Sequence, residues 1–134
     1  MSVFGGMRIS ASGLTAERFR MDVISSNVAN MNTTRTDKGG AYKRKVAVFK
    51  ENYDKKLGML GVKAVQIEED DADMRLEYNP THPDANEEGY VEYPNVDILV
   101  EKTDLMTATR AYEANADALT AQKNMISKAL EIGK

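Results

Sequence analysis

The chain has 134 residues, 42% of them hydrophobic, which suffices for one domain with a modest core. It contains no cysteine, so disulfide bonds and thiolate metal sites are excluded, and its net charge of −3 disfavours nucleic-acid binding despite the basic cluster Lys43-Arg44-Lys45. No stretch is long and apolar enough to span a membrane, and residues 1–8 lack the features of a cleaved signal peptide.

Charge is distributed unevenly along the chain. Residues 1–67 carry 12 lysines and arginines against 5 acidic residues, whereas residues 68–134 carry 6 against 16. The two halves are therefore electrostatically complementary. They could pair within one molecule or between neighbouring molecules, and the sequence leaves both arrangements open.

A first helix is expected over residues 4–31. Apolar residues recur there every seven positions, at Met7, Leu14, Met21 and Val28. Gly13 weakens the middle of this helix by about 1 kcal/mol relative to alanine, so the helix should need packing partners. Residues 27–34 are rich in Asn and Thr, which favour caps and turns, and should end it.

The middle of the chain, residues 42–94, is expected to form a small sheet or an extended arm. Alternating and β-branched residues predict strands over residues 42–49, 61–68, 74–78 and 90–93. Residues 52–61 and 79–89 are predicted loops, and the acidic run at residues 68–73 is interpreted as a solvated turn. With so few large apolar side chains, this insert should lean on the helices.

The last third of the chain predicts one long helix over residues 95–132, which contain neither glycine nor proline. Asn95 is the expected N-cap, with Asp97 in the first turn and Gly133 at the end. A heptad pattern places Ile98, Leu105, Tyr112, Leu119 and Ile126 in one column, and Ala108, Asn115, Gln122 and Ala129 in the next. Such a wide face fits either the core of its own domain or several helical neighbours.

Residues suited to catalysis are scarce. His82 is the only histidine, it lies between two prolines, and we interpret it as a turn residue. Residues 84–89 resemble the start of a calcium loop, but the twelfth position is Asn95 rather than a bidentate glutamate. We therefore expect no enzyme, no catalytic residue, no cofactor and no metal site, and keep a weak calcium- or ligand-binding module as an alternative.

Several short motifs make the chain resemble the axial rod and hook proteins of the bacterial flagellum, and most closely their proximal rod group. The Asn-Val-Ala-Asn string at residues 27–30 is typical of the whole family. The segment from His82-Pro83-Asp84 to Pro94-Asn95-Val96 is the more specific signal for the proximal rod group. Residues 10–14, 108–115 and 128–133 extend the likeness to both ends, and it is weakest over residues 51–77.

The resemblance implies an α+β fold and a mechanical function. Residues 1–41 and 95–134 would form a helical rod core, in which the two long helices pack as an antiparallel, coiled-coil-like pair, and residues 42–94 would form the β-rich insert. The chain would be a structural subunit that polymerises through its terminal helices into the hollow drive shaft and transmits torque to the hook. A helical-hairpin adaptor that never polymerises is the alternative.

The resemblance also implies partners, location and site residues. Partners would be copies of the chain, FlgB-, FlgF- and FlgG-type rod proteins, the FliE-type basal adaptor and the flagellar type III export apparatus, without nucleic acid or direct membrane insertion. The subunit would be exported without a cleaved signal peptide and lie in the basal body, in the periplasm or cell envelope. The predicted assembly interface is the heptad set Leu14, Met21, Val28, Leu105, Tyr112, Leu119 and Ile126. The family motif comprises Asn27, Ala29, Asn30, Tyr42, His82, Pro83, Pro94 and Asn95.

Overall fold

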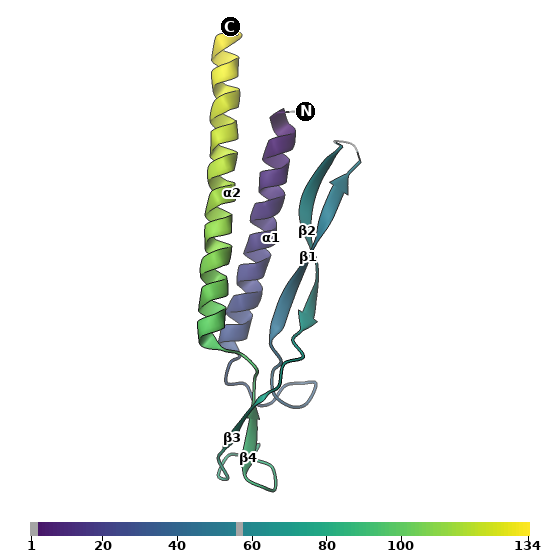
Figure 1. Ribbon diagram of the computed structural model, residues 1–134, viewed down its shortest axis with the longest axis vertical. Coiled ribbons are helices and arrows are strands. Elements are labelled where there is room, and N and C mark those ends of the chain that lie inside the picture. Colours follow the sequence, from purple (N-terminus) through teal and green to yellow (C-terminus); the bar gives the residue numbers. More distant parts are fainter. Residues whose placement is uncertain (1–2, 56–57) are drawn as a thin grey trace.

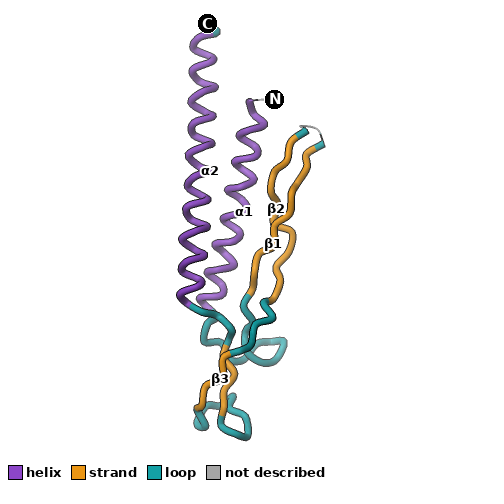
Figure 2. The backbone as a smooth tube through the Cα atoms, viewed as in Figure 1, coloured by secondary structure: helices purple, strands orange, loops and turns teal. Residues whose placement is uncertain are grey.

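The computed structural model describes residues 3–55 and 58–134. Two long antiparallel helices lie side by side, a long β-hairpin runs along one of them, and a short hairpin projects from one end (Figures 1 and 2). The elements, in chain order, are α1 (Val3–Ala29), β1 (Lys45–Asp54), β2 (Met59–Glu69), β3 (Arg75–Tyr78), β4 (Tyr90–Tyr93) and α2 (Ile98–Ile132). The predicted α+β class, with two long packed helices and a β insert between them, is confirmed.

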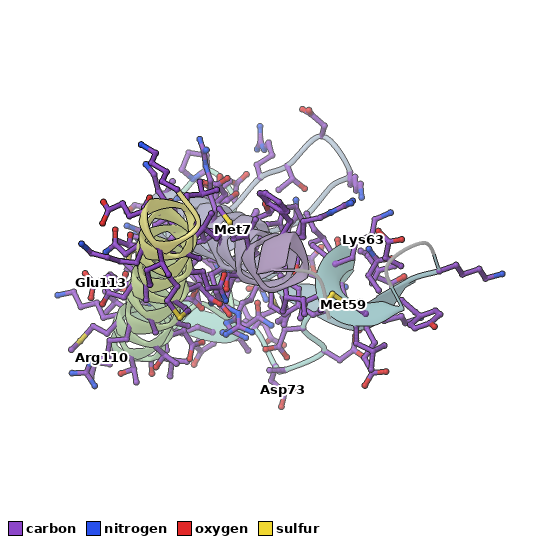
Figure 3. The ribbon with its side chains drawn as sticks, turned by 90° about the horizontal axis from the view of Figure 1, so that it is seen from above. Met7, Met59, Lys63, Asp73, Arg110 and Glu113 are labelled. Carbon is purple, nitrogen blue, oxygen red and sulfur yellow. The ribbon has the colours of Figure 1, made fainter. Side chains whose placement is uncertain are left out.

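Helix α1 forms the middle layer of the molecule. Seen along the long axis, it lies between α2 and the β1–β2 hairpin, and it contacts both (Figure 3). On the outer side of α2, Arg110 and Glu113 point away from α1 (Figure 3). The long hairpin thus packs on the helix pair through α1.

Helix α1 runs without interruption through Gly13 and ends at Ala29. The backbone N–H of Asn30 donates to the carbonyls of Ser26 and Asn27, and its side-chain amide also donates to the carbonyl of Ser26, at 2.8 Å. These bonds satisfy carbonyls that the end of the helix would otherwise leave free. The predicted helix and its Asn-rich end therefore agree with the structure to within two residues.

Helix α2 begins at Ile98, and its N-cap is Asp97, so the prediction of Asn95 as N-cap is wrong. Asp97 has an extended backbone, and its carboxylate accepts a hydrogen bond from the N–H of Leu99 at 2.8 Å. Asn95 is unavailable for capping because its side chain bonds to three backbone groups elsewhere. At the other end, the N–H of Gly133 donates to the carbonyl of Ala129, as expected for a C-cap.

Strands β1 and β2 form a longer hairpin than the sequence predicted. The predicted loop over residues 52–61 is wrong, because β1 continues to Asp54 and β2 starts at Met59; residues 56 and 57 of that loop lie outside the described residues. The ladder shifts register after Val48, where Val65 of β2 has no partner and forms a bulge. This bulge interrupts the alternation of side chains from one face of the hairpin to the other.

The predicted start of the first strand at Tyr42 is also wrong, since β1 begins at Lys45. The backbone N–H of Tyr42 donates to the carbonyl of Thr33, and that of Arg44 donates to the side chain of Asn95, at 2.7 Å. These bonds replace those of a sheet ladder. Residues 42–44 are therefore held in a linking segment that turns from the end of α1 into the hairpin.

Strands β3 and β4 form the short hairpin at the end of the molecule opposite the termini (Figure 1). Their predicted boundaries are accurate to within one residue. The rings of Tyr78 and Tyr90 pack edge to face, 5.3 Å apart, across this pair. Gly89 has a φ of +86°, which a residue with a side chain would adopt only with strain, and its backbone lies against Tyr78.

The hydrophobic core is small and lies mainly where the helices meet the linking segments. It consists of Ala16, Val23, Ile24, Ala41, Tyr42, Val91, Val96 and Ala108. Towards the free ends of the helices the contact is close and polar, because Gly13 faces Asn115 and Gly6 faces Gln122. A Cβ on Gly13 would lie 2.8 Å from the Asn115 Oδ1 atom, so the glycine lets the Asn115 side chain lie directly against α1.

Candidate assembly interface

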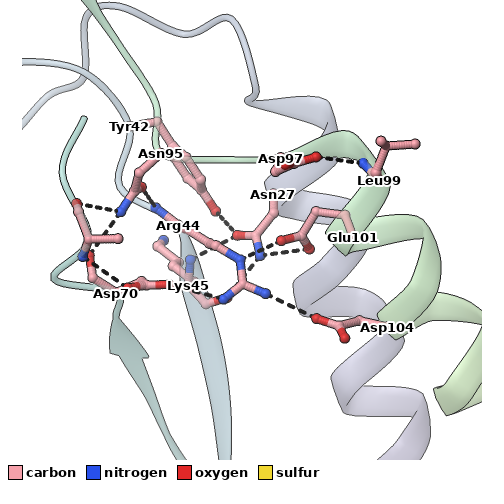
Figure 4. Close-up of polar contacts among 11 residues, drawn as sticks. Asn27, Tyr42, Arg44, Lys45, Asp70, Asn95, Asp97, Leu99, Glu101 and Asp104 are labelled. Carbon is pink, nitrogen blue, oxygen red and sulfur yellow. Dashed lines mark hydrogen bonds and ion pairs between the residues drawn. The ribbon is translucent and has the colours of Figure 1, made fainter. Parts of the chain in front are cut away.

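A partly buried polar cluster joins the two helices to the β1–β2 hairpin (Figure 4). We call it the junction, and it comprises Asn27, Tyr42, Arg44, Lys45, Asp70, Asn95, Glu101 and Asp104. Asn27 is at its centre and is 1% exposed. Its amide nitrogen donates to the carbonyl of Lys45 at 2.8 Å and to Glu101 at 3.2 Å. Its oxygen accepts from the Lys45 N–H and from the Tyr42 hydroxyl, both at 2.9 Å. One side chain of α1 thus binds three other segments.

Arg44 meets three carboxylates in the junction. Its Nε donates to Glu101, and its two terminal nitrogens donate to Asp70 and Asp104, each at 3.1 Å. The Glu101 side chain is completely buried, so this ion pair is shielded from water. Burial disfavours the charge on Arg44, but the hydrogen bonds and charges of Glu101 and Asp70 outweigh burial and raise its pKa.

Asn95 links the strands to the start of α2. Its side-chain oxygen accepts from the Arg44 N–H, and its nitrogen donates to the carbonyls of Asp70 and Ala72, both at 3.0 Å. The Asp70 carboxylate in turn accepts a hydrogen bond from the N–H of Ala72. This bond is the main cause that lowers the pKa of Asp70, and the pairing with Arg44 lowers it further, while burial acts in the opposite direction. The acidic run is therefore anchored at Asp70 and is not simply a solvated turn.

The loop around His82 holds the short hairpin against the segment that follows α1. Asp84 accepts a hydrogen bond from the Thr34 hydroxyl at 2.8 Å and pairs with Arg35. The bond from Thr34, then that from Arg35, lowers the pKa of Asp84. His82 accepts the N–H of Asp84 on its Nδ1 atom and packs edge to face against Tyr93, which suits a turn residue.

In the loop that resembles the start of a calcium loop, one of the candidate ligands is used to close a turn. Asn86, at the third position of the calcium-loop resemblance, accepts the backbone N–H groups of Glu88 and Tyr90 and closes a turn. Within residues 3–55 and 58–134, no group of three or more His, Cys, Asp or Glu side chains is arranged to hold a metal ion.

The family-motif residues divide between three places. Asn27, Tyr42 and Asn95 lie in the junction, with Pro94 fully buried next to Asn95. Asn30 closes the end of α1, whereas Ala29 is exposed. His82 and Pro83 lie in the loop of the short hairpin. The structure thus brings together half of the motif, from three separate stretches of the chain.

The predicted assembly residues are only partly covered within the chain. Leu14, Met21, Val28, Tyr112, Leu119 and Ile126 are half-buried, and Leu105 is 36% exposed. The close contact between the helices is made by the neighbouring column of α2, where Ala108 is 0% exposed and Asn115 and Gln122 face glycines of α1. The role of the heptad set from Leu14 to Ile126 in assembly stays a prediction.

Sequence reasoning missed the charged half of the junction. Arg44 was considered only as part of a basic cluster, and neither Glu101 nor Asp104 was singled out. One signal could have identified Glu101, because it precedes Ala108, Asn115 and Gln122 at the same seven-residue spacing. A charged residue in the contact column of a helix requires a buried partner of opposite charge.

Comparisons with known proteins agree with these features. The family described as "Flagella basal body rod protein" matches residues 7–35, and "Flagellar basal body rod FlgEFG protein C-terminal" matches residues 87–132. The chain is 47% identical to the flagellar basal-body rod protein FlgC of Bacillus subtilis and 36% identical to that of Escherichia coli O157:H7, with both chains of each pair fully covered. It is 38% identical to FlgC of Borreliella burgdorferi, with 98% of each chain covered. Among the described residues, neither helix combines the length and apolar character needed to cross a membrane.

Proposed function

The chain belongs to the FlgC family of flagellar basal-body rod proteins and is a structural subunit of the rod, and we propose that it assembles through its terminal helices into the hollow drive shaft. It functions in motility at the flagellum, in association with other rod components. In our proposal, the shaft transmits torque to the hook, and the role is mechanical rather than enzymatic.

The observation that carries this proposal is that very little of α2 is buried within the chain. Of its 35 residues, only Glu101 and Ala108 are buried. Large apolar side chains remain in water along its length, at Leu99, Val100, Leu105, Met106, Met125, Leu130 and Ile132. Exposed apolar surface of this kind favours association, and helices of neighbouring subunits would cover it.

Partners, export and the division of the chain follow from family membership as proposals. The neighbours would be copies of the chain, FlgB-, FlgF- and FlgG-type rod proteins and the FliE-type adaptor. The flagellar type III apparatus would export the chain without a cleaved signal peptide. Residues 1–41 and 95–134 would act as the coiled-coil-like rod core, with residues 42–94 packed outside it.

A substitution at the half-buried Leu119 of α2 tests the proposal. Leu119→Glu places a charge where assembly would remove water, which should cost several kcal/mol in the rod and less in the free chain, where Leu119 is only half-buried. Asn124→Glu is the matched control, because Asn124 is exposed and lies five residues on, about 140° around the helix.

The measurements are a circular-dichroism melt of each variant and motility in cells that lack the wild-type protein. We expect Leu119→Glu to melt nearly as the wild type does but to abolish motility, while Asn124→Glu restores swimming. A collapsed melt would instead make Leu119 part of an ordinary core, as in the adaptor alternative. Full motility with Leu119→Glu would show that this face does not carry assembly.

A further inference from the structure

The first third of α1 has little of its own to hold it in a helix. Residues 3–13 contain three glycines, whereas residues 14–29 contain none, and glycine in a helix interior lowers its stability relative to alanine. Among the described residues, no apolar side chain of α1 before Ala16 is buried, and Phe4 is 66% exposed. This stretch therefore depends on contacts with other elements to stay helical.

The tip of the β1–β2 hairpin supplies such contacts, because it lies beside the N-terminal end of α1 (Figure 1). The Ser12 hydroxyl accepts a hydrogen bond from the backbone N–H of Val62 at 3.2 Å and donates to the carbonyl of Ile9 at 2.7 Å. A Cβ on Gly61 would lie 2.9 Å from the Ser12 Oγ atom, so the β2 backbone lies directly against α1 here. One hydroxyl thus joins β2 to a turn of α1.

Two further contacts hold the hairpin tip against this stretch. Arg8 pairs with Asp54 at the end of β1, with 3.3 Å between Nη2 and Oδ2. The Met59 side chain occupies the space that a side chain on Gly5 would need. We call these two contacts, together with those of Ser12, the clamp. Every contact in it joins the same short part of α1 to the same end of the hairpin.

The clamp is weaker than the junction at the other end of the hairpin. No residue of β1 or β2, over their described lengths, is buried. The Arg8–Asp54 pair is open to water, with side chains 65% and 33% exposed, and exposed ion pairs contribute little to stability. In the junction, by contrast, Asn27 and Glu101 are at most 1% exposed. The hairpin tip can therefore leave α1 while the junction stays intact.

Helix α2 does little to replace the clamp. Gly6 faces Gln122 of α2, but the Gln122 Oε1 atom is buried and has no hydrogen-bond partner in the part of the chain that the structure describes. A buried oxygen without a partner costs free energy, so this contact between the helices stabilises residues 3–13 only weakly.

We propose that the tip of the β1–β2 hairpin clamps α1 and orders residues 3–13, so that this part of α1 and the hairpin tip open and close as one unit, separate from the junction. Ser12 and Gly61 are the positioning residues, since the hydroxyl of one and the lack of a side chain on the other let β2 reach the helix. The proposal rests on the rod function above, in which α1 is one of the two assembly helices. Only with the clamp closed is the N-terminal end of α1 presented to neighbouring subunits as a helix.

A disulfide across the clamp tests this, because the natural chain has no cysteine. A Cβ on Gly61 would lie 3.5 Å from the Cβ of Ser12, within the range found in disulfides, so Ser12→Cys and Gly61→Cys in one full-length chain should bridge on oxidation. The same variant in its reduced form is the matched control. The measurement is backbone hydrogen exchange of the free chain, followed by mass spectrometry of its peptides.

We expect oxidation to slow exchange at residues 5–13 by about ten-fold or more, because the disulfide holds the clamp closed. Equal exchange in the oxidised and reduced forms would overturn the clamp, since α1 would then keep this helix by itself. Asn27→Ala tests whether the unit is separate, because it should speed exchange at residues 23–29, next to the junction, and leave residues 5–13 unchanged. Equal acceleration at the two ends of α1 would show that the whole helix opens as one unit.

Charge reversal tests the coupling without a disulfide. Asp54→Arg should speed exchange at residues 5–13 by about three-fold, and Arg8→Asp in the same chain should reverse most of that change. Glu51→Arg is the matched control, because Glu51 is exposed on β1 and its side chain points to the opposite face from Asp54. No acceleration with Asp54→Arg, or equal acceleration with Glu51→Arg, would contradict the proposal.

The exchange experiments use the free chain, so their outcomes do not depend on the rod function. In cells that lack the wild-type protein, Asp54→Arg should reduce swimming, and Arg8→Asp in the same chain should restore it. Full swimming with Asp54→Arg would overturn the role of the clamp in presenting α1. Absence of the natural chain from isolated basal bodies would instead overturn the rod function itself and leave the clamp intact.

Discussion

Asn27 and Glu101 meet through a hydrogen bond of 3.2 Å between two side chains that are at most 1% exposed, although 74 residues separate them along the chain. Asn27 comes from the family's Asn-Val-Ala-Asn string, and Glu101 from the first turn of α2. The bond fixes the end of one helix to the start of the other. It therefore sets the register of the helix pair at the point where the hairpin joins it.

Asn27→Ala should destabilise the chain by about 2–3 kcal/mol, because it leaves the Lys45 backbone, the Tyr42 hydroxyl and Glu101 short of buried partners. Asn32→Ala, in the same Asn-rich segment but exposed, should change stability by less than about 0.5 kcal/mol. The measurement is urea unfolding followed by circular dichroism. Equal effects at the two positions would remove the central role given to Asn27.

Arg44→Met should lower the free energy of unfolding by about 3–5 kcal/mol, because it leaves the buried carboxylate of Glu101 without a cation. Replacing Glu101 by Gln in the same chain should recover much of that loss, since no buried charge then lacks a partner. Lys43→Met is the control, because Lys43 is the exposed neighbour. If Glu101→Gln gives no recovery in a double-mutant cycle, the loss of stability does not arise from the unpaired carboxylate of Glu101.

The effect of Gly13→Ala on stability should depend on the residue opposite it. In the natural chain, the new methyl would lie under 3.0 Å from Asn115, and this crowding offsets the roughly 1 kcal/mol gain in helix propensity. In an Asn115→Ala background the obstacle is gone, so Gly13→Ala should stabilise by about 1 kcal/mol. Urea midpoints of the four chains decide this. A uniform gain in both backgrounds would mean that the glycine is not required for close helix contact.

Acid should weaken the fold through Asp70. Its folded-state pKa lies below the unfolded value of about 3.8, chiefly because of the Ala72 N–H bond and then Arg44, so the native state keeps this carboxylate ionised where the unfolded chain takes up a proton. Its contribution is complete above the unfolded pKa and is lost as the pH falls through the folded one. Asp70→Asn should therefore lose less unfolding free energy between pH 5 and pH 2 than the natural chain or the exposed control Asp71→Asn. An equally steep loss in Asp70→Asn would contradict this assignment.

Limited proteolysis of the free chain should remove the unpaired end of α2 first. Met125, Leu130 and Ile132 are exposed, and Lys123 and Lys128 offer trypsin sites in these turns. The first residues of α1 should be cut next, and the region around the junction last. Mass spectrometry of the fragments gives the order. Protection of residues 125–134 equal to that of residues 42–115 would show that the free chain covers its helix ends in some other way.

The sequence predicted the helices well because their signals are local. Heptad spacing, the absence of glycine and proline from α2, and the Asn-rich end of α1 all act within a few turns. The N-cap was placed at Asn95 instead of Asp97 because both residues suit a cap, and the decision depends on strand segments that occupy the Asn95 side chain. The hairpin was predicted too short because residues 52–54 are polar, and pairing with β2, not burial, keeps them extended.

The polar contacts of the junction were harder to predict, because they join residues that are far apart along the chain. Arg44 contacts partners 26, 57 and 60 residues away, and no pattern within a helix or strand encodes such pairings. The family resemblance did point to Asn27, Tyr42 and Asn95, but it gave no reason for their presence. The structure supplies one, since each of these side chains hydrogen-bonds groups that belong to other segments.

The position of the junction has a mechanical consequence for the torque-transmitting role proposed above. Apolar contacts are non-directional, whereas the hydrogen bonds between a guanidinium and three carboxylates depend on geometry and weaken when the groups are displaced. A twisting load on the insert would therefore reach the helices mainly as shear across Arg44 and Asn27. The free ends of the two helices lie more than about 30 Å from the junction along each helix, so in the proposed assembly they could move while the hairpin kept its angle to the helix pair.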